Sequence, residues 1–200
     1  MRIVFATGNE GKMREIRAIL SDLQVEIVSM KEAGIEADIV EDGTTFEENA
    51  VIKAKAVAAY TDDLVLADDS GLEIDALDKA PGIYSARFLG EDTPYTEKNR
   101  ILIEKLADVP PEKRTARFVC AIAAVLPDKS VEVVRETFEG TIGYAPEGEN
   151  GFGYDPIFQV PECGCSSATL SPEQKNEMSH RGKALRAMKK VLADYLKQQS

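Results

Sequence analysis

The chain is poor in the residues that staple or anchor specialised proteins. It has three cysteines among 200 residues, an odd number in a chain of this size, so a disulfide framework is not expected. Its longest unbroken apolar run covers the nine residues 118–126, far short of the roughly 20 that a membrane-spanning helix needs. The first six residues are too short for a signal-peptide core. We therefore expect a cytoplasmic protein with no membrane partner.

Positive charge is also scarce. The 24 Lys and Arg residues stand against 35 Asp and Glu residues, and the net charge of −11 argues against a nucleic-acid partner. Residues 171–200 depart from this balance, with seven basic side chains against three acidic ones. A small basic region on an acidic protein suits a small anionic ligand, and a solvated helix face is the alternative interpretation.

Metal ligands of the zinc type are few. His180 is the one histidine, and Cys163-Gly164-Cys165 has no second cysteine pair to complete a zinc site. Cys120 falls inside the longest apolar run and is predicted to lie in the core. A zinc protein is therefore not expected.

Apolar periodicity predicts a single α/β domain with a mixed sheet. Strands are expected over residues 2–6, 24–29, 64–67, 72–76, 116–126, 130–138 and 157–160. Helices are expected to open at Lys12, after the N-cap Thr45, after the N-cap Thr93 and at Ser179, with one capped turn over residues 171–174. The second of these should run to about residue 60, with a capping box of Thr45 and Glu48. Five glycines predict a flexible loop over residues 139–153.

The first candidate site is the strand, glycine turn and helix at Thr7-Gly8-Asn9-Glu10-Gly11-Lys12. A helix N-terminus offers free N–H groups and a partial positive charge to a phosphate, and Lys12 adds a full charge. The segment is not a Walker A loop, because two residues instead of four separate its glycines. An ordinary strand-to-helix turn is the alternative.

The second candidate is Asp68-Asp69-Ser70-Gly71, which is expected to follow the end of the buried strand over residues 64–67. Ligands of open α/β sheets gather beyond the carboxyl ends of strands. Two adjacent carboxylates repel, so one is expected to gain a raised pKa or a cation such as Mg²⁺. Glu41 and Lys53 are candidates for the same site, and a solvated turn is the alternative.

The third and fourth candidates suit a purine nucleotide. Phe152, Gly153, Tyr154 and Asp155 offer aromatic faces for stacking and a carboxylate for ring N–H groups. The basic residues Lys175, His180 and Arg181 could clamp a phosphate or a ring carbonyl. A tight turn with aromatic plugs and a structural histidine are the alternatives. Taken together, the four candidates point to a nucleoside triphosphate with Mg²⁺.

Six motifs, in this order along the chain, resemble the inosine triphosphate pyrophosphatase family, also called HAM1-like. They are Phe5-Ala-Thr-Gly-Asn-Glu-Gly-Lys12, Thr45-Phe-Glu-Glu-Asn-Ala50, Ala67-Asp-Asp-Ser-Gly-Leu72, Pro81-Gly-Ile-Tyr-Ser-Ala-Arg-Phe88, Gly151-Phe-Gly-Tyr-Asp-Pro-Ile-Phe158, and Lys175-Asn with Ser179-His-Arg181. The resemblance covers nearly the whole chain.

The resemblance implies an elongated mixed sheet in two lobes with the site in the cleft between them, and a homodimer. It implies Mg²⁺-dependent hydrolysis of ITP, dITP and XTP to the monophosphate and pyrophosphate, which cleanses the nucleotide pool. By position, Thr7 to Lys12 would hold the phosphates, Ser70 would contact substrate, and Asp69 would be the general base and a metal ligand. Lys12 and Lys53 would neutralise the charge on the leaving pyrophosphate. The residues Phe152 to Asp155, Lys175, His180 and Arg181 would bind the base.

One departure from the family pattern concerns the metal. The family often has two glutamates ahead of its Gly-x-Thr-Phe segment, and here these positions hold Val40 and Glu41. Glu41 alone is left to join Asp69 as a metal ligand. Two other functions stay open: a Maf-like pyrophosphatase acting on modified nucleotides, and a nucleotide sensor that binds without turnover.

Overall fold

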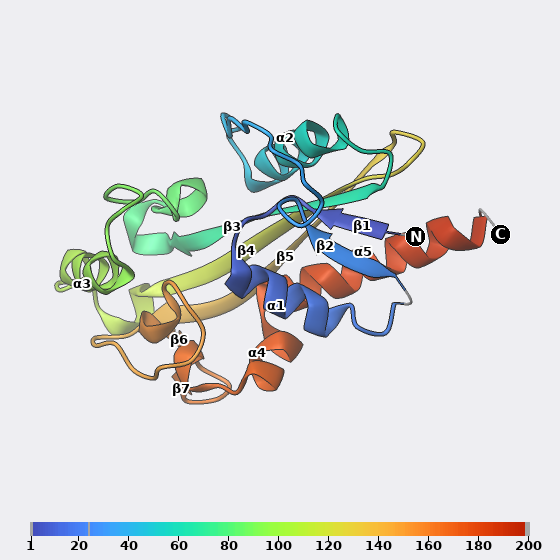
Figure 1. The fold of residues 1–200 in the computed structure, drawn as a ribbon. Coiled ribbons are helices and arrows are strands. Elements are labelled where there is room, and N and C mark those ends of the chain that lie inside the picture. The colour runs from blue at the N-terminus through green and yellow to red at the C-terminus, as the bar shows by residue number, and fades with distance from the viewer. Residues whose placement is uncertain (1, 24, 199–200) are drawn as a thin grey trace. The chain divides into compact units, whose positions relative to one another are not determined.

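The computed structural model describes residues 2–23 and 25–198, which build an α/β fold on a seven-stranded sheet (Figure 1). The strand order is β2-β1-β3-β4-β5-β6-β7. Parallel pairing joins β1 to both β2 and β3, and antiparallel pairing joins β6 to both β5 and β7, so the sheet is mixed. The fold class predicted from the alternation of strands and helices is confirmed.

The strands are β1 (Arg2–Phe5), β2 (Glu26–Ser29), β3 (Leu64–Ile74), β4 (Thr115–Val125), β5 (Val131–Ile142), β6 (Phe158–Val160) and β7 (Cys165–Ser166). The helices are α1 (Glu10–Ile19), α2 (Phe46–Ala58), α3 (Tyr95–Lys105), α4 (Pro172–Met178) and α5 (His180–Gln198). Among the residues that the structure describes, no helix combines the length and the apolar character needed to cross a membrane.

The chain divides into two compact units, and neither is a continuous stretch of sequence. Unit 1 comprises Met1–Asp69, Cys120–Glu136 and Arg181–Ser200, and unit 2 comprises Ser70–Val119 and Thr137–His180. The strands β3, β4 and β5 each contribute residues to both units. The boundary in β3 falls between Asp69 and Ser70, so two neighbouring residues of one candidate motif belong to different units.

Unit 1 has its core on one face of its strands, where α1 and α5 lie side by side, while α2 covers the other face (Figure 1). Met13 and Ile16 of α1 pack with Leu185 and Met188 of α5 and are essentially inaccessible to solvent. Cys120 belongs to the same core, as predicted. Burying each such aliphatic side chain contributes roughly 1.5–3 kcal/mol, which fixes both helices on the sheet.

Unit 2 has a separate core around its own parts of β3, β4 and β5. Leu72, Leu102 of α3, Phe118 and Phe158 are buried together there. Phe118 and Phe158 lie with ring centroids 4.5 Å apart.

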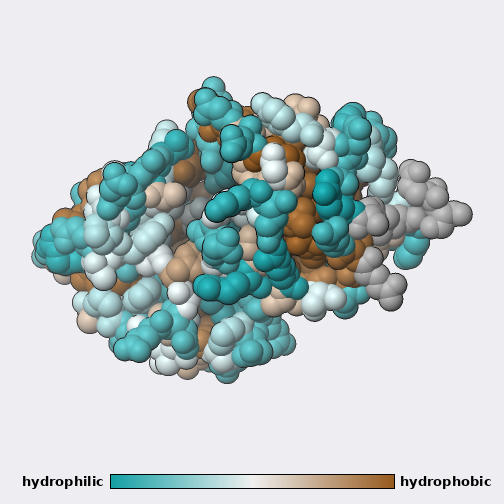
Figure 2. Space-filling view, viewed as in Figure 1, coloured by the Kyte–Doolittle hydropathy of each residue, from teal (hydrophilic) through white to brown (hydrophobic). Residues whose placement is uncertain are grey.

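Hydrophilic side chains cover most of the face drawn in Figure 2, with brown apolar residues visible between them, as expected for a chain with 30% charged residues.

Two helices, α1 and α3, begin at residues other than those predicted from the sequence. The first helix begins at Glu10, two residues before Lys12, because the side chain of Asn9 accepts from the N–H of Lys12 and caps it. Thr93 is not a cap: its hydroxyl donates to the carbonyl of Leu89 at 2.6 Å, and Pro94 takes the N-cap position of α3.

The other three predicted helix starts hold with small differences. The helix predicted to open at Ser179 is α5, which begins one residue later at His180. Thr45 caps α2, but Glu48 completes the motif on Thr44 instead of Thr45, and the helix ends at Ala58 before residue 60. The capping box of Ser171 and Gln174 is present as predicted, and its helix α4 is longer than one turn.

The largest difference from the sequence prediction is in β3. The polar segment 68–71 does not end the strand, because β3 continues through it to Ile74 and absorbs the strand predicted separately over residues 72–76. The strand β5 likewise extends to Ile142, four residues into the predicted loop, and β7 was not predicted. In each case pairing with neighbouring strands outweighs the local preference of Asp, Ser and Gly for turns.

Candidate active site

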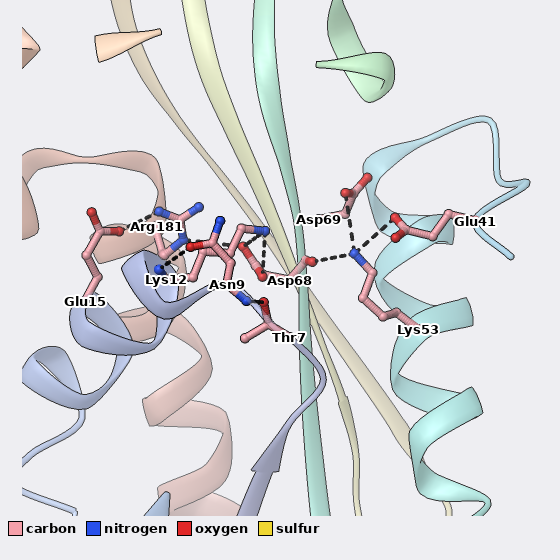
Figure 3. A network of polar contacts seen from close by, with 9 residues as sticks. All are labelled: Thr7, Asn9, Lys12, Glu15, Glu41, Lys53, Asp68, Asp69 and Arg181. Atoms are coloured by element: carbon pink, nitrogen blue, oxygen red, sulfur yellow. Dashed lines mark hydrogen bonds and ion pairs between the residues drawn. The ribbon is translucent and has the colours of Figure 1, made fainter. Parts of the chain in front are cut away.

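Asp68 and Asp69 are consecutive residues of β3, and their side chains point to opposite faces of the strand (Figure 3). This follows from strand geometry, because successive side chains alternate between the two faces of a sheet. Asp68 faces Lys12 and Arg181, whereas Asp69 faces Lys53. The two carboxylates therefore do not share one turn: the side chain of Asp68 pairs with Lys12 and Arg181, and that of Asp69 pairs with Lys53.

The loop between β1 and α1 carries Lys12 to Asp68. Thr7 accepts from the N–H of Asn9 at 3.1 Å, and Asn9 in turn accepts from the N–H of Lys12 at 3.1 Å. The ammonium of Lys12 then lies 3.0 Å from both carboxylate oxygens of Asp68. Gly8 is exposed, and a Cβ added to it would meet nothing within 4 Å. The glycine thus leaves this part of the loop backbone uncovered, next to a helix N-terminus.

The remaining loop residues Glu10 and Gly11 form the first turn of α1, so the structure places all six residues from Thr7 to Lys12 together. An acidic residue in the first turn stabilises the helix through its dipole. Glu10 is exposed there, and its negatively charged side chain would repel a phosphate. That Glu10 contacts a ligand stays a prediction, and its backbone is the part that suits a phosphate.

Arg181 lies beyond this loop and is 3% exposed. Its Nη1 atom is 2.5 Å from an oxygen of Glu15, and its Nε atom is 3.4 Å from Oδ2 of Asp68. Burial by itself would raise the pKa of the Asp68 carboxyl, but Lys12, Arg181 and Lys53 outweigh it and hold that pKa well below its usual range. Asp68 is thus an ionised anchor that holds Lys12 and Arg181 together (Figure 3).

Asp69 has a looser set of partners. Its Oδ2 atom accepts from the side-chain amide of Asn49 at 3.3 Å, and its Oδ1 atom is 3.8 Å from Nζ of Lys53. Nζ of Lys53 also donates to the main-chain carbonyl of Asp68 at 3.1 Å and lies 3.0 Å from Glu41. Burial raises the pKa of the Asp69 carboxyl above its ordinary value, Lys53 opposes this rise, and Glu41 adds to it.

The two predicted metal ligands converge on one cation. Glu41 and Asp69 lie 3.0 and 3.8 Å from the ammonium of Lys53, so their oxygens already face a positive charge. Within residues 2–23 and 25–198, no group of three His, Cys, Asp or Glu side chains could hold a metal ion. Two carboxylates nevertheless fit Mg²⁺, which is usually held by one or two carboxylates together with substrate phosphates. Val40, where the family pattern has glutamate, is 69% exposed.

In unit 2, Asp155 is occupied by three donors from its own surroundings. Its Oδ2 atom accepts from the N–H of Phe152 at 2.8 Å and from Nζ of Lys175 at 2.6 Å, and Oδ1 accepts from the hydroxyl of Ser167 at 2.8 Å. The carboxylate is 2% exposed. Asp155 therefore shapes the loop, and three of the roughly four acceptor positions of its carboxylate are already used. That its oxygens accept from a ring N–H group stays a prediction.

The two aromatic residues of this loop differ in exposure. Tyr154 is buried: its hydroxyl donates to the carbonyl of Ser85 at 2.6 Å, and its ring meets Tyr95 edge-on at 5.1 Å. Phe152 is 38% exposed, with the ammonium of Lys175 5.0 Å from its ring centroid. Gly153 between them accepts from the amide of Asn99 at 3.1 Å. Phe152 is thus the ring of this loop that can stack on a flat ligand, whereas Tyr154 is an internal plug.

The predicted basic clamp falls on both units. Lys175 and His180 belong to unit 2, and Arg181 belongs to unit 1. His180 is 6% exposed and stacks on Phe118 with ring centroids 4.9 Å apart and planes 15° from parallel. Ser70 is half-buried in β3, where unit 2 begins.

Comparison with known proteins identifies the family of this chain. The Ham1 family model matches residues 3–191. The chain belongs to the Ham1 family. Among curated Ham1 relatives, the dITP/XTP pyrophosphatase of Exiguobacterium sibiricum is 47% identical over 98% of this chain and 99% of its own length. The dITP/XTP pyrophosphatase of Vibrio cholerae is 46% identical, with coverages of 96% and 97%.

Solved Ham1 structures agree with this fold. A HAM1 protein from Coxiella burnetii matches with a TM-score of 0.88 at 40% identity, over 97% of this chain and 99% of that one. The Ham1 protein of Staphylococcus aureus matches with a TM-score of 0.86 at 40% identity over the full length of both chains.

Two polar residues of this Ham1 family member belong to the unit 1 network but were not predicted as site residues. Glu15 holds Arg181, and Asn49 holds Asp69. Both lie on helices close to predicted site residues, three positions after Lys12 and four positions before Lys53. That spacing places them on the same helix faces as the two lysines, which is the one signal that could have found them.

Proposed function

We propose that this chain is a nucleoside triphosphate pyrophosphatase. Its substrates are non-canonical purine nucleotides (ITP, dITP and XTP), and its products are the monophosphate and pyrophosphate. Membership of the Ham1 family supports this proposal, as do the relatives named dITP/XTP pyrophosphatase at 46–47% identity.

The setting of Asp69 is the structural observation that carries the proposal. A general base must be ionised and also basic enough to accept a proton, and a buried carboxylate with a raised pKa meets both requirements. Asp69 is 8% exposed and makes one long hydrogen bond, so its Oδ1 atom has room for another donor. Asp68, which is held by two cations, is too acidic for the same task.

The proposed reaction is an attack by water on the α-phosphorus. Asp69 takes one proton of the water as the new oxygen–phosphorus bond forms. The bond between the α-phosphorus and the bridging oxygen breaks, and that oxygen leaves with the pyrophosphate. Lys12 and Lys53 bind the phosphates and balance the charge that develops on the leaving group. The exposed loop backbone at Gly8, next to the N-terminus of α1, adds N–H donors.

Asp69 and Glu41 would hold Mg²⁺, because their carboxylates converge on one positive charge and are hard oxygen donors. When bound there with the substrate, Mg²⁺ supplies further neutralisation of the phosphate charge. Lys53 lies between these two carboxylates and keeps their oxygens together in the free chain.

The residues predicted to bind the purine base include Phe152, Lys175, His180 and Arg181. The exposed ring of Phe152 offers a stacking face, and the contact of Lys175 with that ring places a positive charge at its side. A 6-oxo purine presents an acceptor to donors such as Lys175, His180 and Arg181. Adenine presents an amino group at that position, which would leave a donor facing a donor. Ser70 completes the proposed substrate contacts.

We propose in addition that the chain acts in the cytoplasm as a homodimer and removes deaminated purine nucleotides from the nucleotide pool. The net charge of −11 supports small anionic substrates over nucleic acid, because a long polyanion is repelled on average while local cations can still bind a triphosphate.

The test is hydrolysis of ITP and of ATP by the purified chain with Mg²⁺, with pyrophosphate and single phosphate detected separately. We expect pyrophosphate from ITP at a much higher rate than from ATP, and loss of this product when a chelator is added. Binding of ITP with no product would indicate the nucleotide sensor. Pyrophosphate from modified pyrimidine triphosphates but not from ITP would indicate the Maf-like enzyme.

A further inference from the structure

Asn49 is a fully buried polar residue at the start of α2, and it contacts the carboxylate proposed as the general base. It is 0% exposed, and its Nδ2 atom donates to Oδ2 of Asp69 at 3.3 Å. Its Oδ1 atom accepts from the main-chain N–H of Gly43 at 2.9 Å. Both ends of the amide are therefore used inside unit 1.

We propose that Asn49 is a positioning residue for Asp69, and that Gly43 fixes the orientation of Asn49. This inference rests on the proposed function, because it assigns Asn49 the task of aiming the base of that reaction. Asn49 itself does not touch the reacting atoms.

The orientation of the amide is determined by its partner. An asparagine amide has one end that accepts and one end that donates, and the two are alike in shape. The N–H of Gly43 can bond only to the oxygen end, so the NH₂ group must face Asp69. The main-chain N–H of Gly43 thus directs a hydrogen-bond donor of Asn49 at Oδ2 of Asp69, whether or not the site holds a ligand.

Position 43 requires glycine because of space. A Cβ there would lie 2.6 Å from Oδ1 of Asn49 and 2.8 Å from the Cβ of Glu48. Gly43 is not among the glycines with positive φ, so its backbone conformation is open to other residues. The absence of a side chain is therefore what lets Asn49 reach the N–H of Gly43.

The start of α2 holds Asn49 in place. The carbonyl of Thr45, the N-cap residue, accepts from the main-chain N–H of Asn49 at 3.1 Å, and the side chain of Thr45 accepts from Glu48. Asp69 has a competing partner in Lys53, whose ammonium is 3.8 Å from Oδ1. The bond to Oδ2 opposes rotation of the carboxylate towards that lysine, which would bring a closer ion pair and turn the base away from a water.

The first part of the test measures kcat and KM for ITP in Asn49→Ala, Asn49→Asp and Glu48→Ala. We expect Asn49→Ala to lower kcat roughly 10–100-fold, the usual cost of removing a partner of a site carboxylate, with KM changed less than about twofold. Asn49→Asp keeps the shape but presents an acceptor to Asp69, so it should not restore the rate. Glu48→Ala is the matched control, since Glu48 is exposed and contacts Thr44 on the same turn of α2.

The second part is a double-mutant cycle on the same measurement. Gly43→Ala should lower kcat by a similar factor, because its methyl displaces the amide of Asn49. In the Asn49→Ala background, Gly43→Ala should cause a clearly smaller further loss, since the amide that it displaces is already gone and only its contacts with the Cβ of Glu48 and the main-chain nitrogen of residue 49 remain. Circular dichroism and urea unfolding show whether each variant is folded.

The outcomes separate this inference from the proposed function. A wild-type chain that makes no pyrophosphate from any purine triphosphate overturns the proposed function and the inference together. An active wild type with unchanged kcat in Asn49→Ala, or full additivity between Gly43→Ala and Asn49→Ala, overturns the inference alone. A loss of activity that appears equally in Glu48→Ala would assign the effect to the helix start and would also overturn it.

Discussion

The key carboxylates of the two units are held in different ways. In unit 2, Asp155 accepts from three donors between 2.6 and 2.8 Å and is only 2% exposed. In unit 1, Asp69 accepts one hydrogen bond at 3.3 Å and lies 3.8 Å from its lysine. A buried carboxylate with three short hydrogen bonds stabilises the local structure, whereas one with a single long hydrogen bond can exchange its partner. Asp155 therefore shapes a loop, whereas Asp69 can accept a hydrogen bond from a further donor.

This comparison predicts opposite effects for the same Asp→Asn change, with rate lost in unit 1 and stability lost in unit 2. Asp69→Asn is expected to have the largest effect on rate. Loss of a general base typically lowers the rate 10²–10⁴-fold, so kcat for ITP should fall by about that factor while the substrate still binds.

The stability of Asp69→Asn should not fall. Asp69 has a higher pKa in the folded chain than in the unfolded chain, so folding stability decreases as the pH rises through the range between these two pKa values. The ionised carboxylate therefore opposes folding at neutral pH. Asparagine removes that opposition, and urea unfolding at pH 7 measures the change. Asp62→Asn is the control, since Asp62 is fully exposed. A variant that keeps more than about a tenth of the rate would remove Asp69 as the base.

Asp155→Asn should have the largest effect on stability. It leaves the ammonium of Lys175, whose side chain is 8% exposed, without its carboxylate. Breaking a buried ion pair costs about 3–5 kcal/mol, a large share of a total of roughly 5–15 kcal/mol. The free energy of unfolding in urea measures this. Asp194→Asn is the control, because its pair with Lys197 is exposed and contributes about 0–1 kcal/mol. A loss below about 1 kcal/mol for Asp155→Asn would contradict the scaffold role.

Two glycine substitutions sharpen the comparison with smaller effects. Gly151 has φ +76°, and a Cβ there would lie 2.2 Å from Oδ2 of Asp155, so Gly151→Ala should lower stability by roughly 1–3 kcal/mol. Gly8 has open space, so Gly8→Ala should change stability by less than about 0.5 kcal/mol. Its methyl would instead cover the loop backbone and raise KM for ITP. Equal effects of the two changes on unfolding would show that both loops are structural.

The smallest effect concerns the cysteines. Burial raises the pKa of Cys120 to about 12, so this thiol in the core of unit 1 should not react with a chromogenic disulfide at pH 8. Cys163 of unit 2 is exposed and should react quickly, while Cys165 is half-buried and should react more slowly. Counting thiols before and after denaturation tests this, and three fast thiols in the native chain would contradict it.

Local patterns were enough to predict the caps at Thr45 and Ser171, but not the start of α3, where Pro94 and not Thr93 is the N-cap. The capping box at Ser171 and the N-cap Thr45 were found because a cap depends on residues three positions apart. The loop from Thr7 to Lys12 and the core position of Cys120 were predicted for the same reason: their signals are short and lie in one segment.

The partners of the site were harder to predict, because they come from distant segments. Asp68-Asp69-Ser70-Gly71 has the composition of a turn, but strand pairing keeps it extended and sends its two carboxylates to opposite faces. Nothing near Asp155 in the sequence indicates that Lys175 and Ser167 donate hydrogen bonds to its carboxylate. Residue chemistry and the family resemblance both predicted the candidate site residues, but only the contacts in the structure show which of them hold other parts of the chain in place.

The discontinuity of unit 1 has a consequence for its synthesis on the ribosome. Its core includes Leu185, Met188 and Leu192, and the anchor Asp68 needs Arg181, so unit 1 is incomplete until residues 181–198 have left the exit tunnel. All of unit 2 is made before that segment. A nascent chain arrested at residue 180 would therefore carry every residue of unit 2 but expose the apolar side chains that α5 covers, and such a chain is a natural client for a chaperone.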